Sequence, residues 1–331
     1  MLIALCMAAG LALLLRVVWP QGLPMPGAEV RLQASVLNQW LLGVVRDYAT
    51  VFNGIRNGAL YGLVLPLRVG ISGSATPYIW GFSLTPMMIA AYAALIALLS
   101  GWLLRRLGWR AAAATILAGV FLYYGFLGFP WPAFILIAGL VTWQVSGPRL
   151  AAFAVAGFGI ILLSGLWVPL MQSLYLCTLA VTLCMLIGGA IGVWAAHNDT
   201  VSGIVRPIND ALQTMPQFVF LIPALMFFKV GEFTALIAVM LYAIVPPIRY
   251  VEHGMRHLRA DVVEAARQMG ASPFQMLRDV KLPLSLPVVM LGLNQTIMAG
   301  LSMLAIAALV GTRDLGQQVY VDASQIPTPR P

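Results

Sequence analysis

Long runs of apolar residues, separated by short polar connections, dominate the pattern of the chain. Each run is long enough, or nearly so, to cross a hydrocarbon core about 30 Å thick as a helix. Nine of them are predicted as membrane spans: Leu2–Val18, Phe82–Leu104, Ala111–Gly128, Trp131–Val145, Leu150–Val168, Leu170–Ala196, Gln213–Phe228, Thr234–Ile248 and Leu284–Val310. The pattern predicts an all-α polytopic integral membrane protein. Because neither a basic n-region nor a small-residue cleavage site accompanies the first run, we expect that span to be retained.

A different spacing follows the first run. Apolar residues from Val36 to Ile55 recur at helical intervals, with polar residues between them. This predicts an amphipathic helix that lies at the membrane surface or packs on the spans, and that stops at Asn57-Gly58.

Composition excludes a soluble globular protein. Of the 331 residues, 61% are hydrophobic and 9% are charged, whereas roughly a quarter of an ordinary soluble domain is charged. The formal net charge of +8 would form a surface patch in a nucleic-acid-binding protein. Here we attribute it to basic residues on the cytoplasmic side of a membrane, and we expect no nucleic-acid partner.

The basic residues also predict an orientation. The positive-inside rule places the side with most Lys and Arg in the cytoplasm. In an alternating arrangement of nine spans, eleven of the nineteen fall on one side: Arg105, Arg106, Arg110, Arg149, Arg206, Arg249, Arg256, Arg259, Arg267, Arg278 and Lys281. The N-terminus is then cytoplasmic and the C-terminus is outside.

Residues that could carry chemistry are few. The predicted span interiors contain no Asp, Glu, Lys or His, and Arg16 is their only charge. This disfavours a proton-coupled secondary transporter, which needs titrating groups within the membrane. No P-loop sequence is present, so we do not expect the chain to bind ATP itself. No catalytic set and no metal motif is apparent, so we expect neither an enzyme nor a metal site.

The stretch 251–283 is much longer than the other connections after residue 81. It predicts a helix over Asp261–Met269, a left-handed turn at Gly270, and a second short helix started by a capping box in Ser272–Gln275. Leu282-Pro283 then marks the start of the next span. A rigid, arginine-rich helical loop on the cytoplasmic side is typical of a docking surface for a soluble partner.

The same stretch resembles the EAA loop of bacterial ABC-importer permeases, whose pattern is EAA-x3-G-x9-I-x-LP. The matching residues are Glu264-Ala265-Ala266, Gly270, Val280 in place of Ile, and Leu282-Pro283. The resemblance narrows to the ProU/Opu type, which imports glycine betaine, proline betaine and choline. It runs from about Phe129 to Tyr320 and is carried further by Asp210–Pro216, Gly270–Leu277, Asn294-Gln295-Thr296 and Leu315-Gly316-Gln317.

The resemblance implies a type I permease bundle in the bacterial inner membrane, embedded in lipid and moving a quaternary-amine osmolyte. It also implies a separate ATPase that binds the ATP, an extracytoplasmic substrate-binding protein and, with one EAA loop per chain, a homodimer. Residues implied to form the ATPase-coupling loop are Glu264, Ala265, Ala266, Gly270, Ala271, Ser272, Pro273, Leu282 and Pro283. Polar residues that would line the path, or else join helices by hydrogen bonds, are Gln213, Thr214, Gln217, Asn294, Gln295, Thr296 and Ser302.

Four segments follow from these patterns. Residues 1–80 form a span and an interfacial helix, 81–128 an extra helical hairpin, 129–320 the permease core, and 321–331 a short tail without the last span of the family. Alternatives are a permease of this architecture for an amino acid or a sulfonate, an ATP-independent secondary transporter or channel, and a membrane-embedded enzyme.

Overall fold

The computed structural model describes residues 39–325 and divides the chain into two compact units, 1–52 and 53–331. The predicted span Leu2–Val18 and residues 326–331 lie outside the described residues. The described part of the first unit holds a helix over 39–47 and the beginning of α3 (Ala49–Ala59). Trp40, Tyr48 and Val51 are each more than half exposed, so apolar surface is available to a membrane interface.

The helix does not stop at Asn57-Gly58, so this prediction was wrong. It runs on through the π-helix η1 (Leu60–Val64) into α4 (Leu65–Ser74), because a helical glycine costs only about 1 kcal/mol. The π turn ends directly before Pro66, where the N–H of Leu65 donates to the carbonyl of Leu60. Proline lacks an N–H and clashes with the carbonyl four residues earlier, and the wider turn accommodates it.

The rest of the described chain is helical and has no strand between residues 39 and 325, which confirms the all-α fold class. In order, the elements are α5 (Pro86–Leu107), α6 (Trp109–Gly128), α7 (Trp131–Ser146), α8 (Pro148–Leu163), α9 (Trp167–His197), α10 (Asp199–Thr214), α11 (Phe218–Phe228), α12 (Glu232–Ala243), α13 (Val245–Arg256), α14 (Ala260–Gln268), α15 (Pro273–Gln275), the π-helix η2 (Met276–Lys281), α16 (Leu282–Ala307), the 3-10 helix η3 (Ala308–Val310) and α17 (Leu315–Gln325).

Five helices of the described chain are long and apolar enough to span a membrane: Pro86–Arg106, Trp109–Gly128, Trp167–His197, Glu232–Arg256 and Pro273–Val310. The apolar helices α7 and α8 have 16 residues each.

The prediction of one span over Gln213–Phe228 was wrong. Here the chain bends by 102° between α10 and α11. Met215 is extended (φ −73°, ψ 137°) because the ring of Pro216 disfavours a helical conformation in the residue before it.

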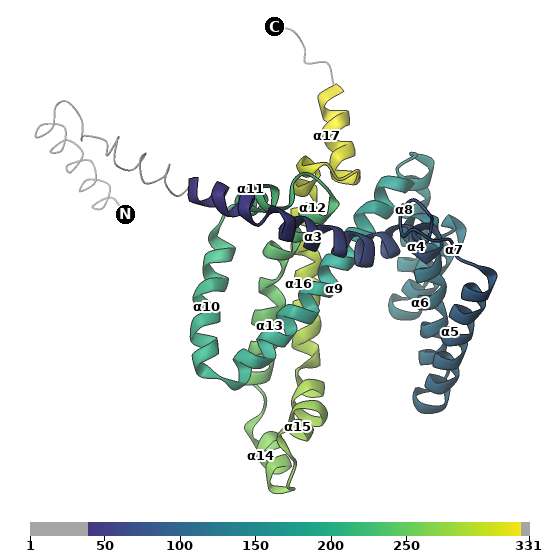
Figure 1. The fold of residues 1–331 in the computed structure, drawn as a ribbon. Coiled ribbons are helices and arrows are strands. Elements are labelled where there is room, and N and C mark those ends of the chain that lie inside the picture. Colours follow the sequence, from purple (N-terminus) through teal and green to yellow (C-terminus); the bar gives the residue numbers. More distant parts are fainter. Residues whose placement is uncertain (1–38, 326–331) are drawn as a thin grey trace, which may run out of the picture. The chain divides into compact units, whose positions relative to one another are not determined.

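The long helix α9 packs against α13 and α16, and α12 packs against α9, α11 and α16. The centre of this bundle is apolar: Met171, Leu176, Leu236 and Met303 are buried. Figure 1 shows α14 and α15 at one end of the bundle and α17 at the other. The stretch 251–283 therefore projects from one end of the packed helices.

The helices α4 and α6 cross backbone against backbone at two glycines. Gly70 and Gly125 have φ values of +77° and +67°, which L side chains rarely adopt. A Cβ on Gly70 would lie 2.2 Å from the carbonyl oxygen of Tyr123, and one on Gly125 would lie 2.1 Å from the backbone nitrogen of Gly70. Neither helix can carry a side chain at the crossing.

Near the crossing, Arg68 of α4 contacts the bundle formed by α9, α12, α13 and α16. Its Nη1 lies 2.7 Å from Oε1 of Glu232, the first residue of α12. Tyr175 of α9 donates its hydroxyl to Oε2 of the same carboxylate at 2.5 Å. The N-terminal helices and the bundle thus share a polar contact, within the single unit 53–331.

Candidate functional site: a coupling loop and a charged cavity

The first helix of the loop ends as the sequence predicts. Gly270 has φ +79°, and its N–H donates to the carbonyl of Arg267 at 3.0 Å. The N–H of Ala271 donates to the carbonyl of Ala266 at 3.2 Å. These two bonds define a Schellman motif, which uses a left-handed glycine to satisfy the last carbonyls of a helix.

The start of α14 is also well defined. Arg259 donates to Asp261 in the first helical turn at 2.5 Å. This hydrogen bond holds the pKa of the Asp261 carboxyl below its usual range. The ionised carboxylate then lies at the positive end of the helix dipole, where it is stabilising.

A complete capping box starts the second helix. The N–H of Gln275 donates to Oγ of Ser272 at 3.3 Å, and the N–H of Ser272 donates to Oε1 of Gln275 at 2.9 Å. Pro273 occupies the first helical position, where its missing N–H leaves no hydrogen bond unmade.

The second helix is not short, and this part of the prediction was wrong. It continues from Pro273 to Val310 as one span-length helix, and Leu282-Pro283 lies inside it rather than at its start. The π turn η2 accommodates Pro283, since the N–H of Leu282 donates to the carbonyl of Leu277. The loop is therefore continuous with a span.

Ala265 and Ala266 of the loop face different surroundings. Ala266 is buried, and α14 packs against η2, whereas Glu264 and Ala265 are exposed. Met269 and Phe274, on either side of the Gly270 turn, are 83% and 68% exposed. The tip of the loop thus offers apolar surface that its own chain leaves uncovered.

The predicted path residues do not form one group. Gln217 donates from Nε2 to Oγ of Ser302 at 3.1 Å, which connects the break after α10 with α16. Thr296 is buried and donates to the carbonyl of Gly292 in its own helix, and Thr214 donates likewise to Ala211. Thr296 and Thr214 therefore use their hydroxyls within their own helices. The exposed members are Gln213, Thr214, Asn294, Gln295 and Ser302.

Gln213 and Gln295, far apart in the sequence, line one cavity of about 620 Å³ between α10, α13 and α16. Across it Arg249 of α13 forms an ion pair with Asp210 of α10. The other lining residues are Arg206, Pro246, Tyr250, Glu252, His253, Arg256 and His257. Within residues 39–325 no three His, Cys, Asp or Glu side chains are grouped as a metal ion would require.

Sequence reasoning missed the charges of this cavity. It placed Arg206 in a connection, whereas Arg206 lies inside α10, and it ended a span at Ile248, whereas that helix reaches Arg256. The span therefore includes Glu252. The spacing of Glu252 and Arg256, four residues apart as on one helix face, was the available signal.

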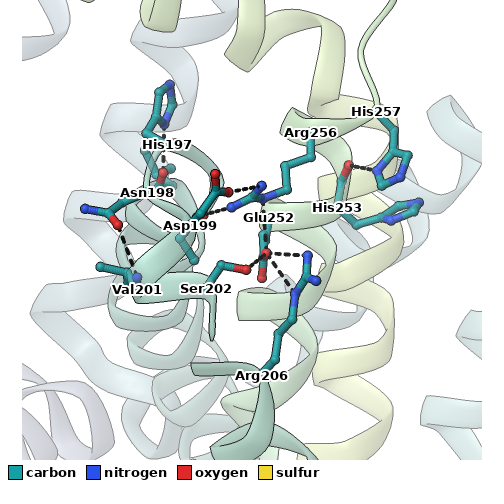
Figure 2. Close-up of polar contacts among 12 residues, drawn as sticks. His197, Asn198, Asp199, Val201, Ser202, Arg206, Glu252, His253, Arg256 and His257 are labelled. Carbon is teal, nitrogen blue, oxygen red and sulfur yellow. Dashed lines mark hydrogen bonds and ion pairs between the residues drawn. The ribbon is translucent and has the colours of Figure 1, made fainter. Parts of the chain in front are cut away.

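Figure 2 shows Glu252 at the centre of a polar cluster formed by the end of α9, by α10 and by α13. Its side chain is 5% exposed. Oε1 accepts hydrogen bonds from Oγ of Ser202 at 2.6 Å and from Nη2 of Arg206 at 2.9 Å, and Nε of Arg256 lies 3.2 Å away. Arg256 also reaches Asp199 at 2.7 Å and the carbonyl of Ala195 at 2.6 Å. We call these residues the Glu252 cluster.

Comparison with known proteins gives consistent matches. The family model described as "Binding-protein-dependent transport system inner membrane component" matches residues 188–325. The glycine betaine transport system permease protein OpuAB of Bacillus subtilis is 37% identical over 215 residues, 65% of this chain and 76% of OpuAB. The glycine betaine/carnitine transport permease protein GbuB of Listeria monocytogenes is 36% identical over 194 residues, 58% of this chain and 69% of GbuB.

The glycine betaine/proline betaine transport system permease protein ProW of Escherichia coli is 39% identical over 193 residues, 58% of this chain. The chain spans about half the length of ProW (54%). The matched family region contains the loop, the bent pair α10–α11 and α16. The chain belongs to the family of inner-membrane permease components of binding-protein-dependent transport systems.

Proposed function

We propose that this chain is the transmembrane permease subunit of an ABC importer that moves a quaternary-amine osmolyte, namely glycine betaine, proline betaine or choline, into the cytoplasm. In this proposal a separate ATPase docks on the loop and hydrolyses ATP, and an extracytoplasmic binding protein delivers the solute. The protein works as a homodimer surrounded by lipid. The observation that carries the proposal is the construction of the loop.

Coupling requires an element that a partner can push and that passes the movement to a span. The loop meets both conditions: its turn is held by a Schellman motif and a capping box, and its second arm continues into the span that ends at Val310. Exposed Met269 and Phe274 supply apolar surface at its tip. A flexible solvated connection would have none of these features.

The names of the three relatives all include glycine betaine, and the charged cavity suits such a zwitterion. Three arginine and two carboxylate side chains line it, together with Tyr250. A carboxylate can be met by a guanidinium, and a quaternary ammonium by a carboxylate or an aromatic face, the latter for about 0.5–2 kcal/mol.

A second copy of the chain would cover the open face of α16. Asn294, Gln295 and Ser302 lie along this face with Met298, and all four are exposed. Polar side chains facing hydrocarbon are costly. Pairing of two such faces removes them from lipid and places the path between the copies, whereas the exposed apolar surfaces of α5 to α8 face lipid.

The orientation yields a labelling prediction. In a background without the three native cysteines, Arg259→Cys should be shielded from a membrane-impermeant thiol reagent in intact cells, and Asp322→Cys should react. Both residues are exposed, so burial does not limit the reaction. Permeabilised cells provide the control, in which both positions should react. Labelling of position 259 from outside intact cells would place the loop outside and overturn its proposed docking to a cytoplasmic ATPase.

Transport itself provides the test of function. The chain, co-purified with its ATPase and reconstituted with the binding protein, should take up glycine betaine, proline betaine or choline at least tenfold faster than an amino acid or a sulfonate. Uptake should require ATP, and the same solutes should stimulate ATP hydrolysis. Uptake without ATP would favour a secondary transporter, and equal rates for all solutes would exclude the substrate class.

A further inference from the structure

The helix α10 is anchored in an unusual way for an apolar bundle. Its buried residues are Ser202 and Asn209, both polar, while Ile204 and Ile208 are 60% and 53% exposed. Apolar packing of α10 against the core is confined to its C-terminal end, where partly buried Leu212 contacts the core cluster. Nearer its N-terminal end the contacts are polar, and the Glu252 cluster supplies them.

The Glu252 cluster lies where the loop joins the bundle. The helix α13 ends at Arg256, and α14 begins at Ala260. Glu252 is one turn before this end, and its carboxylate holds Ser202 and Arg206 of α10. Any displacement of the loop end of α13 by a partner on the loop acts directly on these hydrogen bonds.

The other end of α10 leads to the break in the bent pair. Thr214 is the last residue of α10, and the chain changes direction at Met215–Gln217. Gln217, at the break, donates to Ser302 of α16. A tilt of α10 therefore changes the contact between the break and α16, and it changes the width of the cavity that α10 and α13 enclose.

We propose that Glu252 is a positioning residue for transport, which ties α10 to the coupling loop so that loop movement opens and closes the cavity. The proposal rests on the proposed function of the loop. A buried carboxylate that accepts several charged hydrogen bonds keeps its partners in one geometry, because releasing them leaves an unpaired charge. The tie is thus stiff, while the few apolar contacts of α10 leave this helix, which is continuous through Pro207, free to move relative to the bundle.

The first test removes the ion pair between Arg206 and Glu252 by changing its more exposed partner, Arg206. The Arg206 side chain is 60% exposed, so Arg206→Gln should leave abundance and ATPase association unchanged. Transport should fall at least tenfold, and the ATP hydrolysed per solute moved should rise at least fivefold. Arg206→Lys, which keeps the charge, should recover part of the coupling. Wild-type coupling in Arg206→Gln would overturn the proposal.

A double-mutant cycle tests whether the pair acts as a unit. Arg206→Gln and Glu252→Gln should each uncouple transport, and the double variant should be no worse than the more severe single variant, since the interaction between Arg206 and Glu252 is lost in all three. Additive losses would overturn the proposal. Arg110→Gln is the control, because Arg110 lies in α6, away from the Glu252 cluster. Its guanidinium lies over the ring of its chain neighbour Trp109, 5.9 Å from the ring centre.

A distance measurement makes the test independent of the solute. Spin labels on exposed Ile204 of α10 and Met290 of α16 should change separation when the ATPase complex binds a non-hydrolysable ATP analogue. In Arg206→Gln the change should vanish although the analogue still binds. Persistence of the full change would refute the tie. A parent complex that moves no quaternary amine overturns the substrate assignment alone, because this measurement uses no solute.

Discussion

Gly70→Ala and Gly125→Ala should each prevent the protein from accumulating in the membrane in a folded form. Each glycine has a positive φ, and a Cβ would lie 2.1–2.2 Å from a backbone atom of the crossing helix. Backbone strain costs about 1–3 kcal/mol, and forced overpacking adds about 1–3 kcal/mol. Backbone atoms cannot move aside like a flexible side chain. The loss is therefore a large part of the stability of a typical domain, about 5–15 kcal/mol.

The measurement is the yield of monodisperse detergent-extracted protein and its thermal unfolding midpoint. Gly101→Ala in α5 is the matched control, because Gly101 is helical and its Cβ would meet nothing within 4 Å. We expect that variant to match or slightly exceed the parent, since alanine favours a helix by about 1 kcal/mol. A normal yield and midpoint for Gly70→Ala would show that α4 and α6 do not cross at these glycines.

Gly270→Val should leave the protein abundant in the membrane but reduce transport and solute-stimulated ATP hydrolysis together. The residue lies at the tip of the loop with φ +79°, and a Cβ at this position would meet no atom within 4 Å. The substitution therefore causes strain without a clash. Strain of about 1–3 kcal/mol lowers the population of the docking geometry by about 5- to 150-fold, and it acts outside the packed helices.

The matched comparison is Gly270→Asn, which fills the same open space but tolerates the left-handed conformation. Asparagine should retain most of the transport, and valine should not. Uptake per permease in proteoliposomes, measured beside the amount of co-purified ATPase, separates lost docking from lost folding. If valine and asparagine transport equally well, the left-handed turn has no part in coupling.

Short-range sequence rules were sufficient to predict the turn and the helix cap of the loop. Gly270, Ser272 and Gln275 specify a turn and a cap through bonds between residues at most five apart, and such bonds can be read from spacing. The same holds for the apolar helices α5, α6 and α9, whose length and composition determine their class. The family to which the sequence pointed was confirmed by the family model over residues 188–325 and by the relatives OpuAB and GbuB.

Short-range sequence rules did not predict the contacts between helices, and they did not predict whether a proline ends a helix or lies within it. Pro216 breaks the chain and turns it by 102°, whereas Pro66 and Pro283 are carried inside helices by π turns. The proline alone therefore does not specify whether a helix ends or continues. The continuity of the loop with its span was missed for this reason.

The sequence by itself determined the all-helical membrane class, the rigid turn at Gly270 and the family, because hydrophobic length and short-range hydrogen bonds act between near neighbours in the chain. Only the tertiary structure decided that Arg206 and Ser202 meet Glu252, 46 and 50 residues away, and that Gly70 meets Gly125. Ion pairs and backbone crossings join residues whose separation in sequence carries no signal, and they form only after the helices have packed. The charged cavity and its tie to the loop are consequences of that packing.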